Sequence, residues 1–316
     1  MNKNSKIYVA GHTGLVGSAI IHKLAESGYT NLLYRTIDEM DLTNQAEVDL
    51  FFKNEKPDYV FLAAAKVGGI MANSTYPADF IFQNMAIALN VIHSAYKYGV
   101  KKLINLGSSC IYPKNAPLPL KEEYLLSGFL EPTNEAYAIA KISAIKLCKY
   151  YNEQYKTNFL SAMPTNLYGP GDNYDLENSH VLPAMIRKIY EGYISKSKVV
   201  LWGDGSPLRE FLFSTDLADA LIFLMEKYDS SDIGEFINIG SGDEVSMKEL
   251  SNMIKRVLNF DVDVEWDLSK PNGTPRKLLD TSRLTSYGWK PKIKIEEGIG
   301  LSYLDFVKRY YPSNIF

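Results

Sequence analysis

The chain has 316 residues, 46% of them hydrophobic and 22% charged, with a formal net charge of −3. Its length allows a large core, and its composition is that of an ordinary globular protein with no general attraction to nucleic acid. The longest apolar run, around residues 59–65, is too short to cross a bilayer, and the N-terminus has no signal-peptide pattern. Two cysteines, Cys110 and Cys148, cannot form a disulfide framework, so we expect a cytoplasmic protein without membrane or nucleic-acid partners.

The N-terminal segment predicts a nucleotide-binding turn. A β-rich run at Lys6–Ala10 leads into GHTGLVG at Gly11–Gly17, and a helical pattern follows at Ala19–Ser27. Glycines let a backbone approach a diphosphate that lies on the positive N-terminus of a helix. The spacing is G-x-x-G-x-x-G rather than G-x-G-x-x-G, so the strand and helix on either side carry the prediction more than the string.

The next strand, at Asn31–Arg35, bears on the choice of dinucleotide. A carboxylate at its end would bind the adenine ribose of NAD, but Asp38 comes late and Arg35 stands in its place. A cation there favours the 2′-phosphate of NADP, while NAD stays open.

Strand and helix patterns then alternate as far as about residue 165. They lie at Gln45–Asn54 (helix), Asp58–Ala65 (strand), Phe80–Tyr98 (helix), Lys102–Leu106 (strand), Glu135–Tyr155 (helix) and Phe159–Met163 (strand). This order predicts a doubly wound parallel α/β (Rossmann) sheet, with its ligand beyond the carboxyl ends of the strands. We expect a dinucleotide-binding domain at residues 1–169 and mostly a substrate-binding lobe at 170–316. Segments Glu210–Glu226 and Phe236–Gly240 are expected to complete the sheet.

Tyr137 and Lys141 stand four residues apart on the predicted helix Glu135–Tyr155, so both project from one face. A tyrosine ionises near pH 10, and a fixed ammonium one turn away favours the phenolate, which suits proton transfer. A chance pair on a surface helix is the alternative. The glycine turn upstream, and Ser108 with Cys110 at a strand end, favour a catalytic interpretation.

Several longer blocks resemble the GDP-L-fucose synthase family of extended short-chain dehydrogenase/reductases. They are SSCIYP at Ser108–Pro113, EPTNE at Glu131–Glu135, MPTNLYGP at Met163–Pro170, NSHV at Asn178–Val181 and GTPRKLLD at Gly273–Asp280. The resemblance implies an NADPH-dependent enzyme that epimerises C3 and C5 of a GDP-4-keto-6-deoxy-mannose and reduces its C4 ketone. It also implies a homodimer joined by helices.

The resemblance assigns roles to individual residues. The catalytic residues it implies are Ser108, Tyr137 and Lys141 for reduction and Cys110 and His180 for epimerisation. The cofactor-binding residues are Gly11, Thr13, Gly14, Leu15, Val16, Gly17, Arg35, Asp41, Leu106, Gly107, Lys141, Pro164, Asn166, Leu167 and His180. The substrate-binding residues are Asn166, Arg187, Lys188, Trp202 and Arg209.

Other interpretations stay open for some of these residues. Cys110 could be a small packed residue, His180 a helix-start or solvated residue, Trp202 a core aromatic, and Arg209 a surface partner of Glu210 or Asp216. Cys148 is expected in the core. The other histidines, His12, His22 and His93, receive no role, and no metal site is expected.

The sequence also departs from the family. Thr13 and Ile37 stand where family members carry arginines for the NADP phosphate, and Asn272 stands where an aspartate is common. A C4-reductase for another GDP-4-keto sugar, such as a 6-deoxy-heptose, is therefore an alternative. A non-catalytic nucleotide-binding protein is a third, less favoured because Tyr137 and Lys141 are both present.

Overall fold

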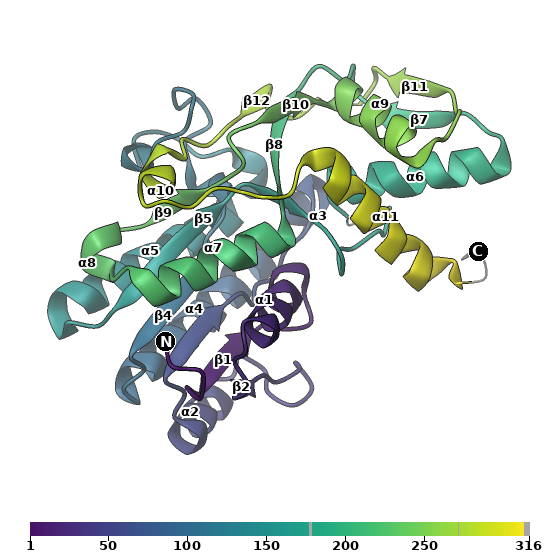
Figure 1. Cartoon of the computed structure of the whole chain (residues 1–316). Coiled ribbons are helices and arrows are strands. Elements are labelled where there is room, and N and C mark those ends of the chain that lie inside the picture. The colour runs from purple at the N-terminus through teal and green to yellow at the C-terminus, as the bar shows by residue number, and fades with distance from the viewer. Residues whose placement is uncertain (177–178, 271, 313–316) are drawn as a thin grey trace.

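A six-stranded parallel sheet forms the centre of the protein, whose computed structural model describes residues 1–176, 179–270 and 272–312 (Figure 1). Across the sheet the strands are β2 (Leu32–Leu33), β1 (Ile7–Ala10), β3 (Tyr59–Leu62), β4 (Lys102–Leu106), β5 (Phe159–Pro164) and β9 (Ile237–Ile239). Strands β1, β4 and β5 are buried along their whole length, as expected of parallel strands covered on both faces. The predicted doubly wound α/β fold is confirmed.

Helices cover both faces of this sheet. One face carries α1 (Leu15–Glu26) and α7 (Ser214–Lys227), and the other carries α2 (Gln45–Glu55), α4 (Pro77–Lys97) and α5 (Glu135–Tyr155). The buried lysine Lys102 fixes α7 to the sheet, because its Nζ donates to the carbonyl oxygens of Leu224 (3.0 Å) and Met225 (2.9 Å). A cation at a helix C-terminus satisfies carbonyls that the helix leaves unpaired.

Some predicted boundaries shift. Helix α1 begins at Leu15 rather than Ala19, because Gly14 is its N-cap with extended backbone angles (φ −82°, ψ 170°). Strand β2 has only two residues and β3 ends at Leu62. Both are shorter than predicted. For β3 the reason is that its partner β1 ends at Ala10, opposite Leu62, and offers no ladder beyond it.

A second group of elements lies beyond the carboxyl end of the sheet and packs its own hydrophobic core (Figure 1). Its strands are β6 (Asn166–Tyr168), β7 (Val199–Trp202), β8 (Leu208–Phe213), β10 (Glu244–Ser246), β11 (Val264–Asp267) and β12 (Arg276–Lys277), and its helices are α6 (Val181–Ser195), α9 (Met247–Leu258) and α11 (Ile295–Tyr310). Strand β8 pairs with β6, β10 and β12, and β7 pairs with β11.

The two returning segments thus differ. Residues 236–240 supply β9 of the central sheet, whereas residues 210–226 supply most of β8, in the second sheet, and helix α7. The domain boundary between residues 169 and 170 stays a prediction. The remaining short elements are α3 (Ile70–Thr75), η1 (Ser109–Ile111), η2 (Glu122–Tyr124), η3 (Pro132–Asn134), α8 (Ser230–Ile233) and α10 (Ser282–Ser286).

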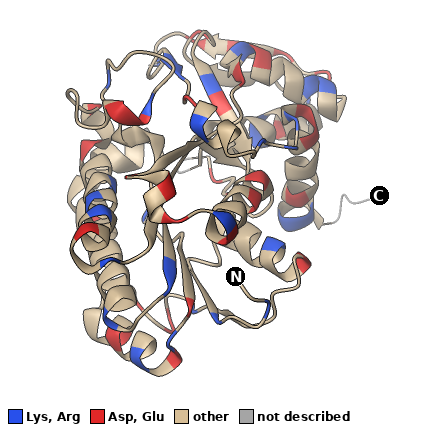
Figure 2. Ribbon diagram, turned by 60° about the vertical axis from the view of Figure 1, so that its left-hand side comes forward, with Lys and Arg blue, Asp and Glu red and all other residues tan. Residues whose placement is uncertain are grey.

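Basic and acidic residues are interspersed over the ribbon in Figure 2, in keeping with the small net charge. Within the described ranges, no helix is long and apolar enough to cross a bilayer. Nor do those residues contain a group of three or more His, Cys, Asp or Glu side chains placed to hold a metal ion.

Candidate active site

The glycine turn lies where the order of the strands reverses. From β1 the chain goes to β2 on one side and to β3 on the other, which opens a crevice at the carboxyl end of β1. Gly11 has φ +83°, and a Cβ there would lie 2.7 Å from the backbone of Ala64. A Cβ on Gly17 would lie 2.0 Å from the Gly11 carbonyl oxygen. Both positions therefore require glycine.

The start of α1 fits a dinucleotide diphosphate. The helix has no side-chain cap and no acidic residue in its first turn. The amides of Leu15, Val16 and Gly17 lack intrahelical partners by their position and can bind phosphate oxygens, with the exposed Thr13 and Gly14 at the mouth of the turn. His12, which the sequence left without a role, lies here with its buried Nδ1 unpaired among the described residues, 4.6 Å from the Tyr34 ring between centroids.

The predicted phosphate-binding cation and Asp41 have protein partners in this structure. Arg35 Nη2 lies 3.0 Å from Glu55 Oε1. Asp41 Oδ1 accepts hydrogen bonds of 2.8 Å from the amide and hydroxyl of Thr43. The Glu55 carboxylate therefore competes with a 2′-phosphate for Arg35.

The predicted reductase residues meet at the end of β4. Lys141, buried, donates from Nζ to the Leu106 carbonyl oxygen (2.9 Å), and its Nζ lies 5.7 Å from the centroid of the Tyr137 ring. Ser108 lies beside Tyr137, close enough for its side chain to lower the pKa of the Tyr137 hydroxyl. A Cβ on Gly107 would lie 2.0 Å from the end of the Met163 side chain, which would have to move to make room for it.

The expected effect of Lys141 on Tyr137 is not found. Burial raises the pKa of Tyr137 above its ordinary value, with the nearby Ser108 side chain opposing the rise. Burial also lowers the pKa of Lys141 to about 8. The spacing of the two residues predicted one shared face correctly but ignored the cost of removing both side chains from water.

The two predicted epimerisation residues come from different segments. Cys110 is buried in η1, and its amide donates to Ser108 Oγ (3.4 Å), so Ser108 contacts both Tyr137 and the Cys110 segment. Burial raises the pKa of the Cys110 thiol, and the positive charge of Lys277 is the largest influence against that rise. His180 is the exposed N-cap of α6, as the helix-start alternative expected, although its side chain makes no capping bond. Its neighbour Asn178 lies outside the described residues.

The turn after β5 connects the cofactor side with the second sheet. Pro164 ends β5, and Asn166 and Leu167 start β6. Asn166 donates from Nδ2 to the Glu210 carbonyl oxygen (2.8 Å), next to Arg209 in β8. Asn166, which is predicted to bind cofactor and substrate, is thus hydrogen-bonded to the strand that carries Arg209.

Two cations stand side by side beyond this turn. Arg209 in β8 pairs in parallel register with Lys277 in β12, so both side chains project from one face of the sheet. Arg209 donates to the Leu208 carbonyl oxygen, and neither cation pairs with a carboxylate among the described residues. The expected surface pairs of Arg209 are thus not formed. Sequence reasoning missed Lys277, because only the pairing of two strands distant in the chain brings it to Arg209.

The predicted nucleotide-binding residues on α6 and β7 have different environments. Trp202 is 54% exposed, which rules out a core role, and its ring is flanked by Nζ of Lys188 (6.0 Å) and of Lys270 (5.7 Å). A base could stack on such a ring. Arg187, in contrast, is held by the Glu191 carboxylate (2.7 Å) and the Tyr174 carbonyl oxygen (3.0 Å).

Comparison with known proteins agrees with this geometry. Residues 7–240 match the NAD dependent epimerase/dehydratase family. The chain is 57% identical to GDP-L-fucose synthase 1 of Arabidopsis thaliana, covering 97% of this chain and 94% of that protein. Two solved structures are similar over 98% of the chain. One is a GDP-6-OMe-4-keto-L-xylo-heptose reductase from C. jejuni (TM-score 0.93, 40% identity, 99% of that chain). The other is a GDP-L-fucose synthetase from Naegleria fowleri bound to NADP (TM-score 0.91, 30% identity, 95% of that chain). The chain therefore belongs to the NAD dependent epimerase/dehydratase family, in the branch that contains the GDP-L-fucose synthases.

Proposed function

We propose that the protein epimerises C3 and C5 of GDP-4-keto-6-deoxy-D-mannose and reduces the C4 ketone with NADPH to give GDP-L-fucose. One observation carries the proposal. Ser108 lies beside Tyr137 and accepts a hydrogen bond from the amide of Cys110, so the reductase residues share one site with Cys110. The identity to the Arabidopsis GDP-L-fucose synthase, over nearly the whole chain, supports the substrate.

Epimerisation needs one group that removes a proton and one that returns it. The 4-ketone acidifies the hydrogens on C3 and C5, because the electrons left behind are delocalised into an enediolate. Cys110 as thiolate and His180 as acid supply the two groups. Lys277 favours the thiolate against the effect of burial.

Reduction at C4 needs a proton donor beside the new alkoxide. Tyr137 gives that proton, and its raised pKa keeps it protonated at neutral pH. Ser108 hydrogen-bonds the same oxygen, and charged Lys141 stabilises the phenolate that Tyr137 becomes. When bound, NADPH supplies the hydride that reduces C4. The first-turn amides of α1 would hold its diphosphate.

The substrate nucleotide has a matching set of groups. Arg209 and Lys277 present adjacent positive charges to a diphosphate, and Arg can bind it in a bidentate manner. Trp202 offers a stacking face to guanine, with Lys188 at its edge. Arg187 stays among the proposed substrate residues, and to bind the substrate its guanidinium would exchange the Glu191 carboxylate for it.

A second candidate is C4 reduction of another GDP-4-keto sugar, such as a 6-deoxy-heptose. The likeness to the C. jejuni heptose reductase favours it. So does Asn272 in place of the usual aspartate. Its Oδ1 accepts the Asp204 amide (2.8 Å) and lies so close to Gly203 that a Cβ there would be 2.1 Å away. Asn272 therefore shapes the turn that follows Trp202.

The test is proton NMR of GDP-4-keto-6-deoxy-mannose with the enzyme in deuterated water, before and after NADPH is added. Deuterium at C3 and C5, followed by the spectrum of GDP-L-fucose, is expected. Reduction without exchange would instead support a plain C4-reductase. An inert substrate would refute the proposal and make the GDP-4-keto-heptose the next compound to assay.

We also propose a homodimer formed through α4 and α5. Phe82 and Leu89, seven residues apart, expose 67% and 48% of their surface on one face of α4, and Tyr150 (55%) is exposed on α5. A second copy covering these side chains would bury an apolar helical face. Analytical ultracentrifugation should show a dimer for the wild-type protein and a monomer for Phe82→Glu.

We also propose a cytoplasmic location. The two cysteines are free thiols, which suits a reducing compartment.

A further inference from the structure

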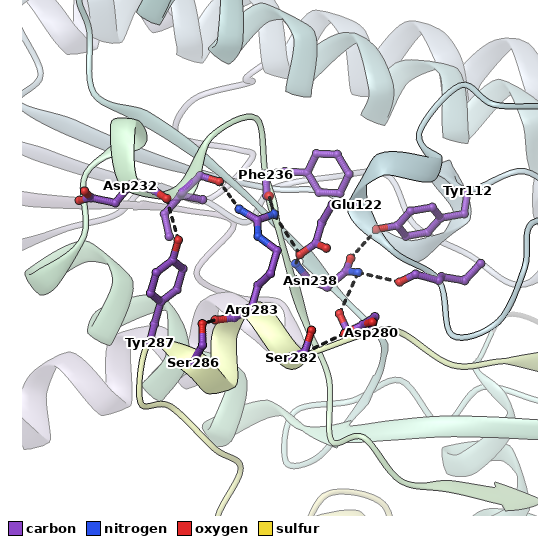
Figure 3. Close-up of polar contacts among 12 residues, drawn as sticks. Tyr112, Glu122, Asp232, Phe236, Asn238, Asp280, Ser282, Arg283, Ser286 and Tyr287 are labelled. Carbon is purple, nitrogen blue, oxygen red and sulfur yellow. Dashed lines mark hydrogen bonds and ion pairs between the residues drawn. The ribbon is translucent and has the colours of Figure 1, made fainter.

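A buried polar network is centred on Asn238 in β9, as Figure 3 shows. Asn238 is fully buried, and each polar atom of its amide has a partner. Its Oδ1 accepts the Tyr112 hydroxyl (2.5 Å), and its Nδ2 donates to the carbonyl oxygens of Leu120 (2.9 Å) and Asp280 (3.1 Å). Because a buried amide is costly when unpaired, the three bonds fix these segments relative to one another.

The first of these segments carries Cys110. Tyr112 stands two residues after Cys110, and both are buried, as is Ile111 between them. The Ile111 amide bonds back to the Ser108 carbonyl oxygen (3.2 Å), so the chain from residue 108 to 112 forms one short turn. Burial keeps Tyr112 protonated by raising its pKa, so it remains a donor to Asn238. The position of its hydroxyl therefore helps to set that of the Cys110 thiol.

The second segment carries Lys277. It runs from Lys277 in β12 to Asp280 and is paired with residue 120, because the Leu120 amide bonds the Leu278 carbonyl oxygen (2.8 Å) and the Asp280 amide bonds the Leu120 carbonyl oxygen (2.9 Å). Lys277 is also the cation that acts most strongly on Cys110. Asn238 thus connects the segment of Cys110, the proposed base, with the segment of Lys277, the cation that acts on its thiol.

The backbone of Asn238 has hydrogen-bond partners of its own. Glu122 Oε1 accepts the backbone amide of Asn238 (3.1 Å) and lies 3.3 Å from Arg283 Nη1. Arg283 in turn donates to the carbonyl oxygens of Phe236 (3.2 Å) and Ile233 (2.7 Å), which both come just before β9 (Figure 3). The backbone of Asn238 is therefore held independently of the bonds that its side chain makes.

We propose that Asn238 is a positioning residue for epimerisation, since its side chain holds the Cys110 segment and the Lys277 segment at a fixed separation. The inference rests on the proposed function, because it assigns the proton removal at C3 and C5 to Cys110. Asn238 acts through Tyr112 and the 277–280 segment and does not touch the reacting atoms.

Two variants and a matched control test the proposal. Tyr112→Phe removes only the hydroxyl that bonds Asn238, and Asn238→Leu replaces the amide by an apolar group of similar size. The control is Tyr287→Phe, which deletes the same atom from a tyrosine whose hydroxyl bonds the Asp232 carbonyl oxygen (2.7 Å), away from both segments. Each protein is assayed for deuterium uptake at C3 and C5 and, separately, for reduction of the already epimerised 4-ketone.

We expect Tyr112→Phe and Asn238→Leu to slow deuterium uptake by roughly tenfold or more, because misplacing a reacting group by about 1 Å can cost that much. Reduction should stay within about twofold of wild type. The pH profile of exchange should also move to higher pH, as the thiol loses its cation. Tyr287→Phe should leave both rates unchanged.

Equal loss of exchange and reduction in both variants would show a purely structural role and overturn the proposal, as would unchanged exchange. Loss of exchange in Tyr287→Phe would overturn it too, since that hydroxyl reaches neither segment. A wild-type enzyme that reduces its substrate without exchange would refute the proposed function itself, and the positioning role with it.

Discussion

The pH dependence of stability should follow one buried carboxyl group, that of Asp172. The residue is 5% exposed, in the turn after β6, and its Oδ1 accepts the Asn173 amide (2.7 Å). Its buried Oδ2 has no partner among the described residues. Burial raises the pKa of this carboxyl from 3.8 to about 7, with the charge of Arg309 opposing the rise.

The sign of the effect follows from proton binding. Between about pH 4 and 7 the folded protein holds a proton on Asp172 that the unfolded chain has released, so stability falls as pH rises through this window. For pKa values of 3.8 and about 7, the loss between pH 5 and pH 8 is about 2.5 kcal/mol. Asp172→Asn keeps an acceptor for the Asn173 amide and cannot ionise, so this loss should vanish.

Thermal unfolding at pH 5 and pH 8 measures the difference. For a chain of this length, about 2.5 kcal/mol corresponds to roughly 4 °C. The melting temperature of Asp172→Asn relative to wild type should therefore be about 4 °C higher at pH 8 than at pH 5. The exposed Asp261→Asn serves as the control and should show no such difference. A gain for Asp172→Asn that is equal at the two pH values would refute the reasoning.

Three further predictions concern the cofactor turn, the reductase site and the sheet. Gly17→Ala places a Cβ 2.0 Å from the Gly11 carbonyl oxygen and should abolish NADPH binding in calorimetry, and wild-type affinity would contradict that geometry. The rate of C4 reduction at saturating NADPH should fall above about pH 8, because Lys141 has a pKa of about 8 and loses its charge there. A rate that stays constant to pH 10 would contradict the prediction that reduction needs a charge on Lys141 that is lost near pH 8. Lys102→Met leaves buried carbonyl oxygens of α7 unpaired and should lower the melting temperature by about 2–4 °C. No change in unfolding would mean that this contact contributes nothing.

Local patterns in the sequence predicted much of the framework. The helix at Glu135–Tyr155 and the strand at Lys102–Leu106 match the structure at both ends, because apolar spacing and strand length decide them locally. The glycine turn was likewise predictable, since strand, turn and helix follow one another directly. Features that depend on local order thus appear in the sequence.

Features that depend on topology do not. Lys277 reaches Arg209 through pairing of β12 with β8, which no local pattern reports. The four-residue spacing of Tyr137 and Lys141 could not show that the Lys141 ammonium bonds the Leu106 carbonyl oxygen. Nor could it show that burial raises the pKa of Tyr137. Asn238 looked like an ordinary strand residue, and its role rests on contacts with chain segments far from it in sequence.

The central claim is that one site holds separable groups for epimerisation and reduction. The most direct measurement is deuterium exchange with Tyr137→Phe in deuterated water with NADPH present. The account predicts that this variant forms no reduced product, while deuterium still enters the substrate at C3. Reduction at the wild-type rate would contradict the role of Tyr137. Complete loss of exchange would show that the two activities are not separable at this site.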